Sequence, residues 1–540
     1  MAGGNIGRIM VPPIGEYHDI QAILRSGFGK LEEACFLLLR IIDPGQARAW
    51  LAAVIEETGT DKRSYRVTRA GHLESQQEQV LQLAFTARGL QTLGLPEDLF
   101  PSSPFERAQG GKTDTFSAEF CLGMAGKEAE TAGCSRRLGD VGENAPFNWE
   151  WGIPDNMPDA LVMLYARKDC LTAFERIVRG DLAPAFKVCH RLHTAPAARD
   201  VKLRREPFGF MDGISQPEID WAANRAPGTL GDLEYGNLIA AGEFLLGYPN
   251  EYGLYTQRPL LDPERDPDNV LCQAEDDPRK RDLGRNGTYL VLRQLEQDVS
   301  GFWQFVGAQS PNDKGISLAE GMVGRRLANG DPIVTVSGIE IRGVCADADH
   351  IRQNGFTFET DPDGLACPFG AHIRRANPRT ADLPGGRQGF VSGLLRMLGL
   401  KRGGLREDLL SSSRFHRIIR RGRPYSEAIG REGGQQERRR SGLHFIALNA
   451  NIARQFQFIQ NSWIVNSKFN GLDGESDPLL GNRCASPMGQ RTDGFSLPQA
   501  RGPNRRITGL PQFVTVRGGA YFFLPSLRAL RFLAGQNGEA

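Results

Sequence analysis

The sequence predicts an α+β protein in which helices pack on antiparallel sheets. Apolar segments of strand length alternate with amphipathic segments of helix length, and the same alternation appears in both halves of the chain. The composition, 40% hydrophobic and 24% charged residues, is typical of a globular protein. At roughly 150 residues per domain, the 540 residues allow two to four domains.

The first half of the chain carries three strand-like segments, each followed by a helix-like one. Residues 44–57 place apolar side chains at three-and-four spacing, which is typical of an amphipathic helix. Gly94 follows the second helix and ends it. The expected strands are 34–41, 80–85 and 159–166. The expected helices are 44–57, 86–93 and a segment through Leu171, Phe174 and Val178.

The second half repeats this pattern and predicts a duplicated α+β unit. Strands are expected over 287–295 and 442–448, with helices over 299–306 and 452–459. Near the C-terminus, 513–517 and 520–523 are expected to pair as a hairpin across Gly518 and Gly519.

Charge, apolar runs and cysteine usage exclude several classes of protein. The net charge of +1 argues against nucleic acid or a membrane surface as the main partner. No apolar run is long enough to span a bilayer, and the N-terminus lacks the pattern of a secretory signal. Nine cysteines without a Cys-x-x-Cys pair indicate reduced thiols. We therefore expect a cytoplasmic protein without structural zinc.

Three connections are longer than a compact domain usually needs: 258–285, 382–413 and 426–441. The last two flank an arginine-rich region, 414–440. This region could bind a polyanion, although the balanced net charge makes a solvated loop the simpler interpretation.

Three segments carry residues that could act chemically. His372 follows small residues that leave room for a large flat ligand, and arginines follow it. Asp212 stands in a turn-like Asp-Gly pair among apolar side chains, where an unpaired carboxylate is costly. Arg420 ends a short apolar run, and a strand over this run would place its side chain toward the interior. His190 and His193 have helical spacing but no third ligand, so a surface helix is the simpler interpretation.

Taken together, these segments resemble the dye-decolorizing (DyP-type) haem peroxidases. Residues 209–213, Gly-Phe-Met-Asp-Gly, are similar to the family's Gly-x-x-Asp-Gly signature. His372, in Gly-Ala-His-Ile-Arg-Arg, resembles its proximal haem ligand, and Arg420, in Ile-Ile-Arg-Arg-Gly-Arg, resembles its distal arginine. The resemblance runs from residue 19 to residue 533, in the family's order.

The resemblance implies two ferredoxin-like domains, as in a dimeric α/β barrel, with haem b in the C-terminal one. We expect an N-terminal domain over 15–235 that carries the Gly-x-x-Asp-Gly motif, and a haem-binding domain over 236–535. Insertions are expected near 258–285 and 383–413, since the chain is longer there than compact members of the family.

The resemblance also implies roles for individual residues. His372 is the iron ligand, and Asp212 and Arg420 act on hydrogen peroxide as acid/base and fixed charge. The haem contacts are expected at Ile214, Ser215, His372 and Arg374. The acceptor behind His372 is expected at Asn451, and relays to the surface at Trp303, Trp463, Tyr425 or Tyr521.

The implied function is a peroxidase that reduces hydrogen peroxide and oxidises small aromatic reductants such as dyes or phenols. The alternative is a haem-handling protein that stores or strips haem without peroxidase turnover. His372 serves both functions, whereas only peroxide cleavage needs Asp212 and Arg420. Neither function requires nucleic acid or a membrane, and a homo-oligomer is compatible with both.

Overall fold

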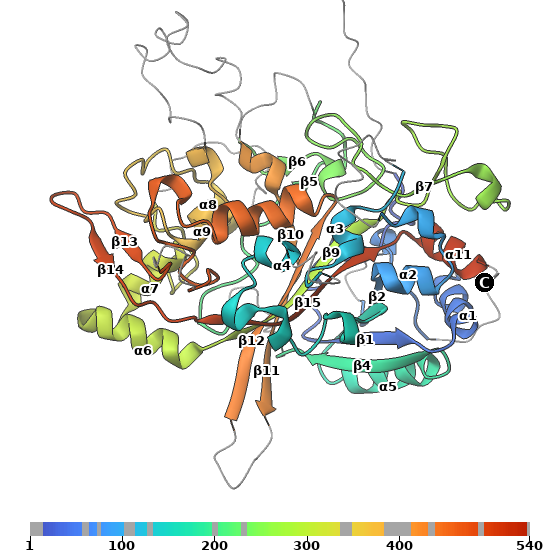
Figure 1. Ribbon diagram of the computed structural model, residues 1–540, viewed down its shortest axis with the longest axis horizontal. Coiled ribbons are helices and arrows are strands. Elements are labelled where there is room, and N and C mark those ends of the chain that lie inside the picture. The colour runs from blue at the N-terminus through green and yellow to red at the C-terminus, as the bar shows by residue number, and fades with distance from the viewer. Residues whose placement is uncertain are drawn as a thin grey trace, which may run out of the picture.

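The protein is described by a computed structural model that covers residues 15–56, 64–72, 77–101, 114–126, 133–196, 204–227, 235–334, 348–382, 412–429, 438–483 and 491–536. Within these residues, one antiparallel sheet of nine strands runs through the molecule, with helices packed against it (Figure 1). The strands follow an open path from β10 to β4 rather than a closed barrel.

The first half of the sheet has the ferredoxin-like order β4-β1-β3-β2. Its strands are β1 (Glu33–Ile41), β2 (Gln79–Phe85), β3 (Ala160–Ala166) and β4 (Phe186–His193). The crossing helices are α1 (Pro44–Ile55), which Asp43 caps, and α5 (Leu171–Leu182). β3 is buried along its whole length, which explains its continuous apolar sequence.

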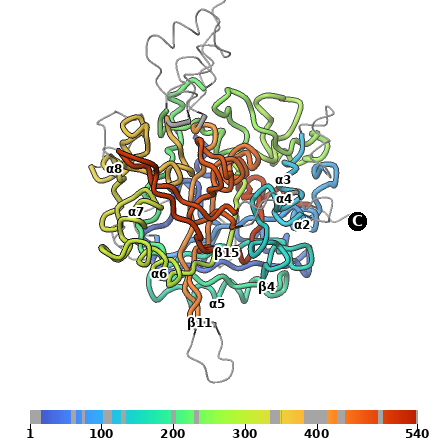
Figure 2. The backbone as a smooth tube through the Cα atoms, turned by 60° about the vertical axis from the view of Figure 1, so that its left-hand side comes forward, coloured from blue at the N-terminus to red at the C-terminus, as the bar shows by residue number. Residues whose placement is uncertain are grey.

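The second half repeats this order. If β9, β10, β12 and β15 are counted as the first to fourth strands of this half, their order in the sheet, β15-β9-β12-β10, is 4-1-3-2. The first half has the same order. The strands of the second half are β9 (Thr288–Gln297), β10 (Ile419–Arg420), β11 (Arg423–Ile429), β12 (Arg438–Asn449) and β15 (Val514–Leu524). β11 also pairs with β12 and extends away from the body (Figure 2). The predicted α+β fold with two ferredoxin-like halves is confirmed, while the boundary at 235/236 stays a prediction.

The second half carries the longer connections. After β9 come α6 (Val299–Gln309) and α7 (Ile316–Val323), and between β12 and β15 the chain forms two π-helical turns, Ala453–Gln457 and Ile459–Ile464. The remaining helices are α2 (Ala87–Thr92), α3 (Ala118–Leu122), α4 (Gly133–Arg137), α8 (Ala348–Asn354), α9 (His372–Ala376) and α11 (Leu527–Gly535). The short strands are β5 (Glu218–Ile219), β6 (Leu238–Ile239), β7 (Leu260–Leu261), β8 (Arg281–Asp282), β13 (Phe495–Leu497) and β14 (Arg505–Ile507).

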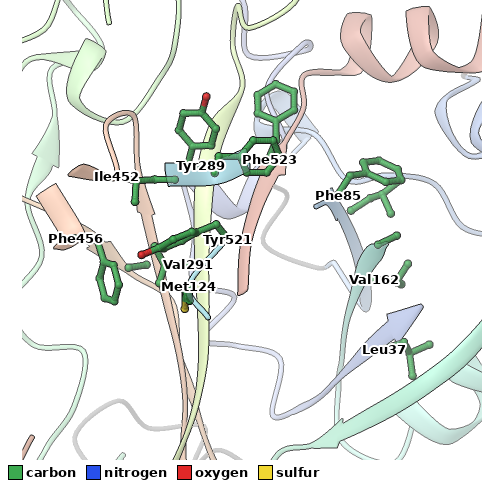
Figure 3. Close-up of a cluster of buried hydrophobic side chains, with 14 of the residues drawn as sticks. Leu37, Phe85, Met124, Val162, Tyr289, Val291, Ile452, Phe456, Tyr521 and Phe523 are labelled. Atoms are coloured by element: carbon green, nitrogen blue, oxygen red, sulfur yellow. The ribbon is translucent and has the colours of Figure 1, made fainter. Parts of the chain in front are cut away.

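The two halves meet where β15 lies beside β2. A single register pair, Phe523 with Phe85, links the two strands. Both side chains are buried in a cluster that extends from Leu37 and Val162 in the first half to Tyr289 and Tyr521 in the second (Figure 3). Apolar burial, at about 25 cal/mol per Å², therefore holds the halves together where ladder hydrogen bonds are few.

The predicted C-terminal hairpin is wrong. β15 is one continuous strand that pairs with β9 on both sides of Gly518 and Gly519, with a bulge between Val516 and Gly518. Both glycines are needed because side chains lie against them: a Cβ at Gly518 would be 2.5 Å from the indole nitrogen of Trp151, and one at Gly519 would be 2.8 Å from Met124 Sδ. A Gly-Gly pair here allows close approach of a side chain rather than a turn.

Two other expectations have different outcomes. His190 and His193 lie on the strand β4, not on a helix. The insertion expected near 383–413 falls almost entirely outside the described residues, whereas 258–285 forms short strands β7 and β8. In the part of the chain that the structure describes, none of the helices has the length and apolar character needed to cross a membrane.

Candidate active site

A cavity is lined by the loop 206–217, by the strands β9, β12 and β15, by α9 and by the two π-helical turns. Its empty space, counted with its open mouth, is about 1650 Å³. Of the site residues predicted from the sequence, five line this cavity: Asp212, Ile214, Ser215, His372 and Arg420. Segments up to 208 residues apart in the chain therefore converge on one space.

His372 is the first residue of α9, and a buried carboxylate determines its tautomer. Its Nδ1–H donates to Asp477 Oδ2 at 2.9 Å. Asp477 is fully buried, and its other oxygen accepts the backbone N–H groups of Leu479 and Leu480 at 2.9 and 2.8 Å. Burial by itself raises the pKa of Asp477, but the attraction of His372 and these hydrogen bonds outweigh it and lower the pKa. The Nε2 lone pair of His372 is thus left available as a metal ligand.

The predicted acceptor behind His372, Asn451, is wrong. Its Oδ1 accepts the backbone N–H of Arg454 at 2.9 Å, so it caps the π-helical turn that follows β12. The sequence carried a signal for the actual acceptor: Asp477 stands directly before Pro-Leu-Leu, a carboxylate at the edge of an apolar segment. This is the same environment that singles out Asp212.

Asp212 and Arg420 form a pair on the cavity wall. Arg420 Nη1 lies 3.5 Å from Asp212 Oδ1, and each side chain is about one-third exposed (35% and 33%). Gly213, at φ +75°, turns its N–H back onto Asp212 Oδ1 at 2.6 Å. At the end of β10, Arg420 Nη2 donates to Ser215 O at 3.0 Å. The loop and the strand therefore hold a carboxylate and a guanidinium side by side, both facing the cavity.

Glu206, which was not predicted from the sequence, organises the loop that carries Asp212. Its carboxylate accepts the backbone N–H groups of Phe208 and Phe210, at 3.0 and 2.9 Å, and the Nε2–H of Gln297 on β9 at 2.7 Å. Burial raises the pKa of Glu206. These bonds fasten the Gly-Phe-Met-Asp-Gly loop to the central sheet.

Two buried arginines, Arg325 and Arg379, also line the cavity. Burial, together with repulsion from Arg379 and Arg420, lowers the pKa of Arg325 to about 9. Among the described residues, Arg325 makes no ion pair, and its guanidinium donates to the carbonyl oxygens of Gly330 and Gln353. A guanidinium in this situation favours an anionic group within the cavity.

Arg374 does not line the cavity, so the structure does not support the cofactor contact predicted for it. It donates to Asp361 Oδ2 at 3.0 Å and Cys367 O at 2.7 Å, and lies over the rings of Phe358 and Phe369. Because α9 places Arg374 two positions after His372, it points to another side of this short helix. Its role here is to hold the segment before α9.

The predicted relay residues lie in different environments. Trp463 lines the cavity, Trp303 donates to Phe208 O at 3.2 Å, and Tyr425 and Tyr521 are buried in the sheet. Their role as relays stays a prediction. The described residues contain no group of three or more His, Cys, Asp or Glu side chains arranged to hold a metal ion.

Comparisons with known proteins agree with this architecture, although no family model matches the chain. A dye-decolorizing peroxidase of Mycetinis scorodonius is 26% identical over 535 residues, covering 95% of this chain and 86% of the relative. One from Auricularia auricula-judae is 25% identical with the same coverage. The crystal structure of a fungal DyP-type peroxidase from Auricularia auricula-judae superposes with a TM-score of 0.66 at 22% identity, over 96% of this chain and 99% of that one. A DyP-type peroxidase from Anabaena gives 0.64 at 20% identity, over 96% and 94%.

Proposed function

This chain belongs to the DyP-type peroxidase family, and on that premise we propose that it is a haem peroxidase that reduces hydrogen peroxide with electrons from small aromatic donors. One observation carries the proposal: His372, with its tautomer set by Asp477, and the Asp212–Arg420 pair line the same cavity. Similar solved structures support the ligand classes, because one describes a heme pocket and another a complex with 2,6-dimethoxyphenol.

The residues of the cavity fit haem b. His372 Nε2 would bind the iron, Ile214 and Ser215 would contact the macrocycle, and Arg325 and Arg379 would face its carboxylates. The described lining residues include no cysteine, which favours a non-covalently held haem. When bound, haem supplies the redox-active iron that takes two oxidising equivalents from peroxide and passes them on one at a time.

The protein's own residues manage the protons and the charge. Asp212, as a carboxylate, accepts a proton from hydrogen peroxide and returns it to the departing oxygen, which leaves as water. Arg420 cannot deprotonate, so it supplies a fixed positive charge next to that carboxylate. Overall, one hydrogen peroxide takes two electrons and two protons from two phenolic donor molecules and yields two waters.

The decisive experiment follows the absorption spectrum of the haem-loaded protein before and after stoichiometric hydrogen peroxide. We expect haem uptake in the wild type, its loss in His372→Ala, and a spectral change within seconds of adding peroxide. In Asp212→Asn we expect unchanged haem binding but a reaction with peroxide about 10²- to 10⁴-fold slower, the usual contribution of a general acid/base.

Asp268→Asn is the matched control, because Asp268 is an exposed carboxylate far along the chain from these segments. It should bind haem and react with peroxide at the wild-type rate. Equal rates in Asp212→Asn and wild type would instead favour the haem-handling alternative, in which no acid/base is needed.

A further inference from the structure

A second cavity adjoins the first and is lined from both halves of the molecule. Its walls are Gly27, Gly29 and Pro196 from the first half, the loop 204–216, and the segment 420–424 around the start of β11. Its empty space, counted with its mouth, is about 1150 Å³. Glu206, Asp212, Gly213 and Arg420 line both cavities, so a ligand here would lie next to the Asp212–Arg420 pair.

This second cavity is strongly basic. Five arginines line it, against two carboxylates; the arginines are Arg204, Arg205, Arg420, Arg421 and Arg423. Glu206 is occupied by amide donors, and Asp212 faces Arg420. Within the described chain, Arg205, Arg421 and Arg423 form no ion pair.

Carbonyl oxygens hold these three arginines in place. Arg205 donates to Gly209 O and Leu327 O at 2.8 and 2.6 Å, and Arg421 donates to Ile23 O and Leu24 O at 2.8 and 3.1 Å. The carbonyl partners take up only some of the five N–H donors of each guanidinium and leave its positive charge uncompensated. Accordingly, burial lowers the pKa of Arg421 to about 10.

We propose that this second cavity binds the carboxylate or sulfonate group of an aromatic donor. Fixed guanidinium groups match the geometry of such oxyanions, and their donors are already positioned by the backbone. The bound group would compete with Asp212 for Arg420 at the wall that the cavities share. The donor role rests on the proposed peroxidase function, whereas binding of the oxyanion does not.

The first test is calorimetry on the full-length, haem-loaded protein without peroxide, using 4-hydroxybenzenesulfonate, phenol and inorganic sulfate as probes. We expect the sulfonate to bind at least tenfold more tightly than phenol, and its affinity to fall as ionic strength rises. Sulfate distinguishes a site for a free oxyanion from a site for an oxyanion attached to an aromatic ring. Binding equal to that of the sulfonate would identify a site for free oxyanions, and weaker binding a site that also holds the ring. Phenol binding as tightly as the sulfonate would overturn the proposal.

The second test uses variants. Arg205→Gln and Arg421→Gln should each weaken sulfonate binding at least tenfold. Arg505→Gln is the matched control, because Arg505 is exposed and likewise donates to a carbonyl oxygen, that of Gln309, and it should bind as the wild type does. Should Arg421→Gln fail to fold, Arg205→Gln decides the outcome. Wild-type affinity in Arg205→Gln would refute the proposal.

Steady-state kinetics distinguish this inference from the proposed function. In Arg205→Gln we expect KM for 4-hydroxybenzenesulfonate to rise about tenfold relative to KM for 2,6-dimethoxyphenol, with the ratio of the two kcat values unchanged. A protein that binds the sulfonate but does not react with peroxide contradicts only the peroxidase assignment. A peroxidase that discriminates neither probe contradicts only the anion site.

Discussion

At the scale of the residue, Asp477 controls the chemistry available to His372. A buried, ionised acceptor makes the imidazole more basic and would stabilise the oxidised form of a bound iron. Asp477→Asn keeps the acceptor for Leu479 and Leu480 but places a weaker acceptor, or an amide donor, opposite His372 Nδ1. We expect a higher iron(III)/iron(II) midpoint potential and about 10- to 100-fold weaker haem retention.

Spectroelectrochemistry and haem transfer to apomyoglobin measure these two quantities. Asn451→Asp is the informative counterpart, because Asn451 caps a π-helical turn and does not touch His372. Its potential should equal that of the wild type. An unchanged potential in Asp477→Asn would show that the hydrogen bond to His372 does not tune the iron.

Glu206 is predicted to position Asp212 rather than to react. Glu206→Ala leaves the backbone N–H groups of Phe208 and Phe210 without their acceptor, at a cost of about 1–3 kcal/mol. We expect slower reaction with peroxide together with a lower free energy of unfolding, whereas Glu206→Gln, which retains an acceptor oxygen, should recover most of both. Stopped-flow absorption and urea unfolding provide the two readouts. Equal peroxide reactivity in Glu206→Ala and wild type would exclude the positioning role.

The sequence contained part of this site in recognisable form. Asp212, His372 and Arg420 each stand in a short segment that is not decisive alone, but the three segments together resemble the motifs of the DyP-type family. Asp477 and Glu206 act through contacts across 105 and 91 residues, to His372 and Gln297. Such contacts depend on how loops cross one another, which no local spacing encodes.

At the scale of the element, β15 depends on two adjacent glycines. A Cβ at Gly518 would approach Trp151 within 2.5 Å, and that indole donates to Gln294 on β9 at 2.8 Å. Gly518→Ala should therefore lower the free energy of unfolding by about 1–3 kcal/mol, as overpacking does. Urea unfolding followed by circular dichroism measures the change.

Gly180 in α5 provides the opposite case. A Cβ there meets nothing within 4 Å, and the residue has helical φ, so Gly180→Ala should stabilise the protein by about 0.5–1 kcal/mol. Destabilisation in both variants would mean that the effect at Gly518 is not specific to the contact with Trp151.

The strands of this protein that are buried along their whole length could be predicted from the sequence. β1 and β3 are buried on both faces and appear as apolar runs in the sequence, and β9 begins with such a run. The glycine pair in β15 misled the same reasoning, because a bulge under a tryptophan and a hairpin turn both require small residues. Only the partner, Trp151, distinguishes them.

At the scale of the whole molecule, buried histidines should make stability depend on pH. His444 on β12 is buried, and burial lowers its pKa to about 4, with nearby His193 and Arg440 adding to the effect. In the unfolded chain it titrates near 6.5, so protonation favours unfolding as pH falls from 6.5 towards 4. Between pH 7 and pH 5 this group alone should remove about 2 kcal/mol of stability.

His444→Gln, which can still donate to His193 O, should remove that part of the pH dependence. His18→Gln, at an exposed position, should not. Urea unfolding at pH 7 and pH 5 compares them. An identical pH dependence in His444→Gln and wild type would assign the acid sensitivity to other groups, such as His416, whose pKa burial also lowers to about 4.

The duplicated α+β architecture was predictable because each half repeats the same alternation of strands and helices. The way in which the halves join could not be predicted. One residue pair, Phe523 with Phe85, links β15 and β2, each an edge strand of its own half, and the two residues are more than 400 positions apart in the chain. The open path of the sheet follows from this join, since each half contributes one edge to it and keeps the other.

The position of β15 has a consequence for biosynthesis. Of the strands that the structure describes it is synthesised last, yet it lies in the middle of the sheet, between β9 and β2. Until it is made, both neighbours expose an unpaired edge, and the cavity that His372 lines lacks Val514 from its wall. A nascent chain that stalls before residue 514 thus exposes two unpaired strand edges and an incomplete cavity, so cofactor binding has to wait until β15 has been made.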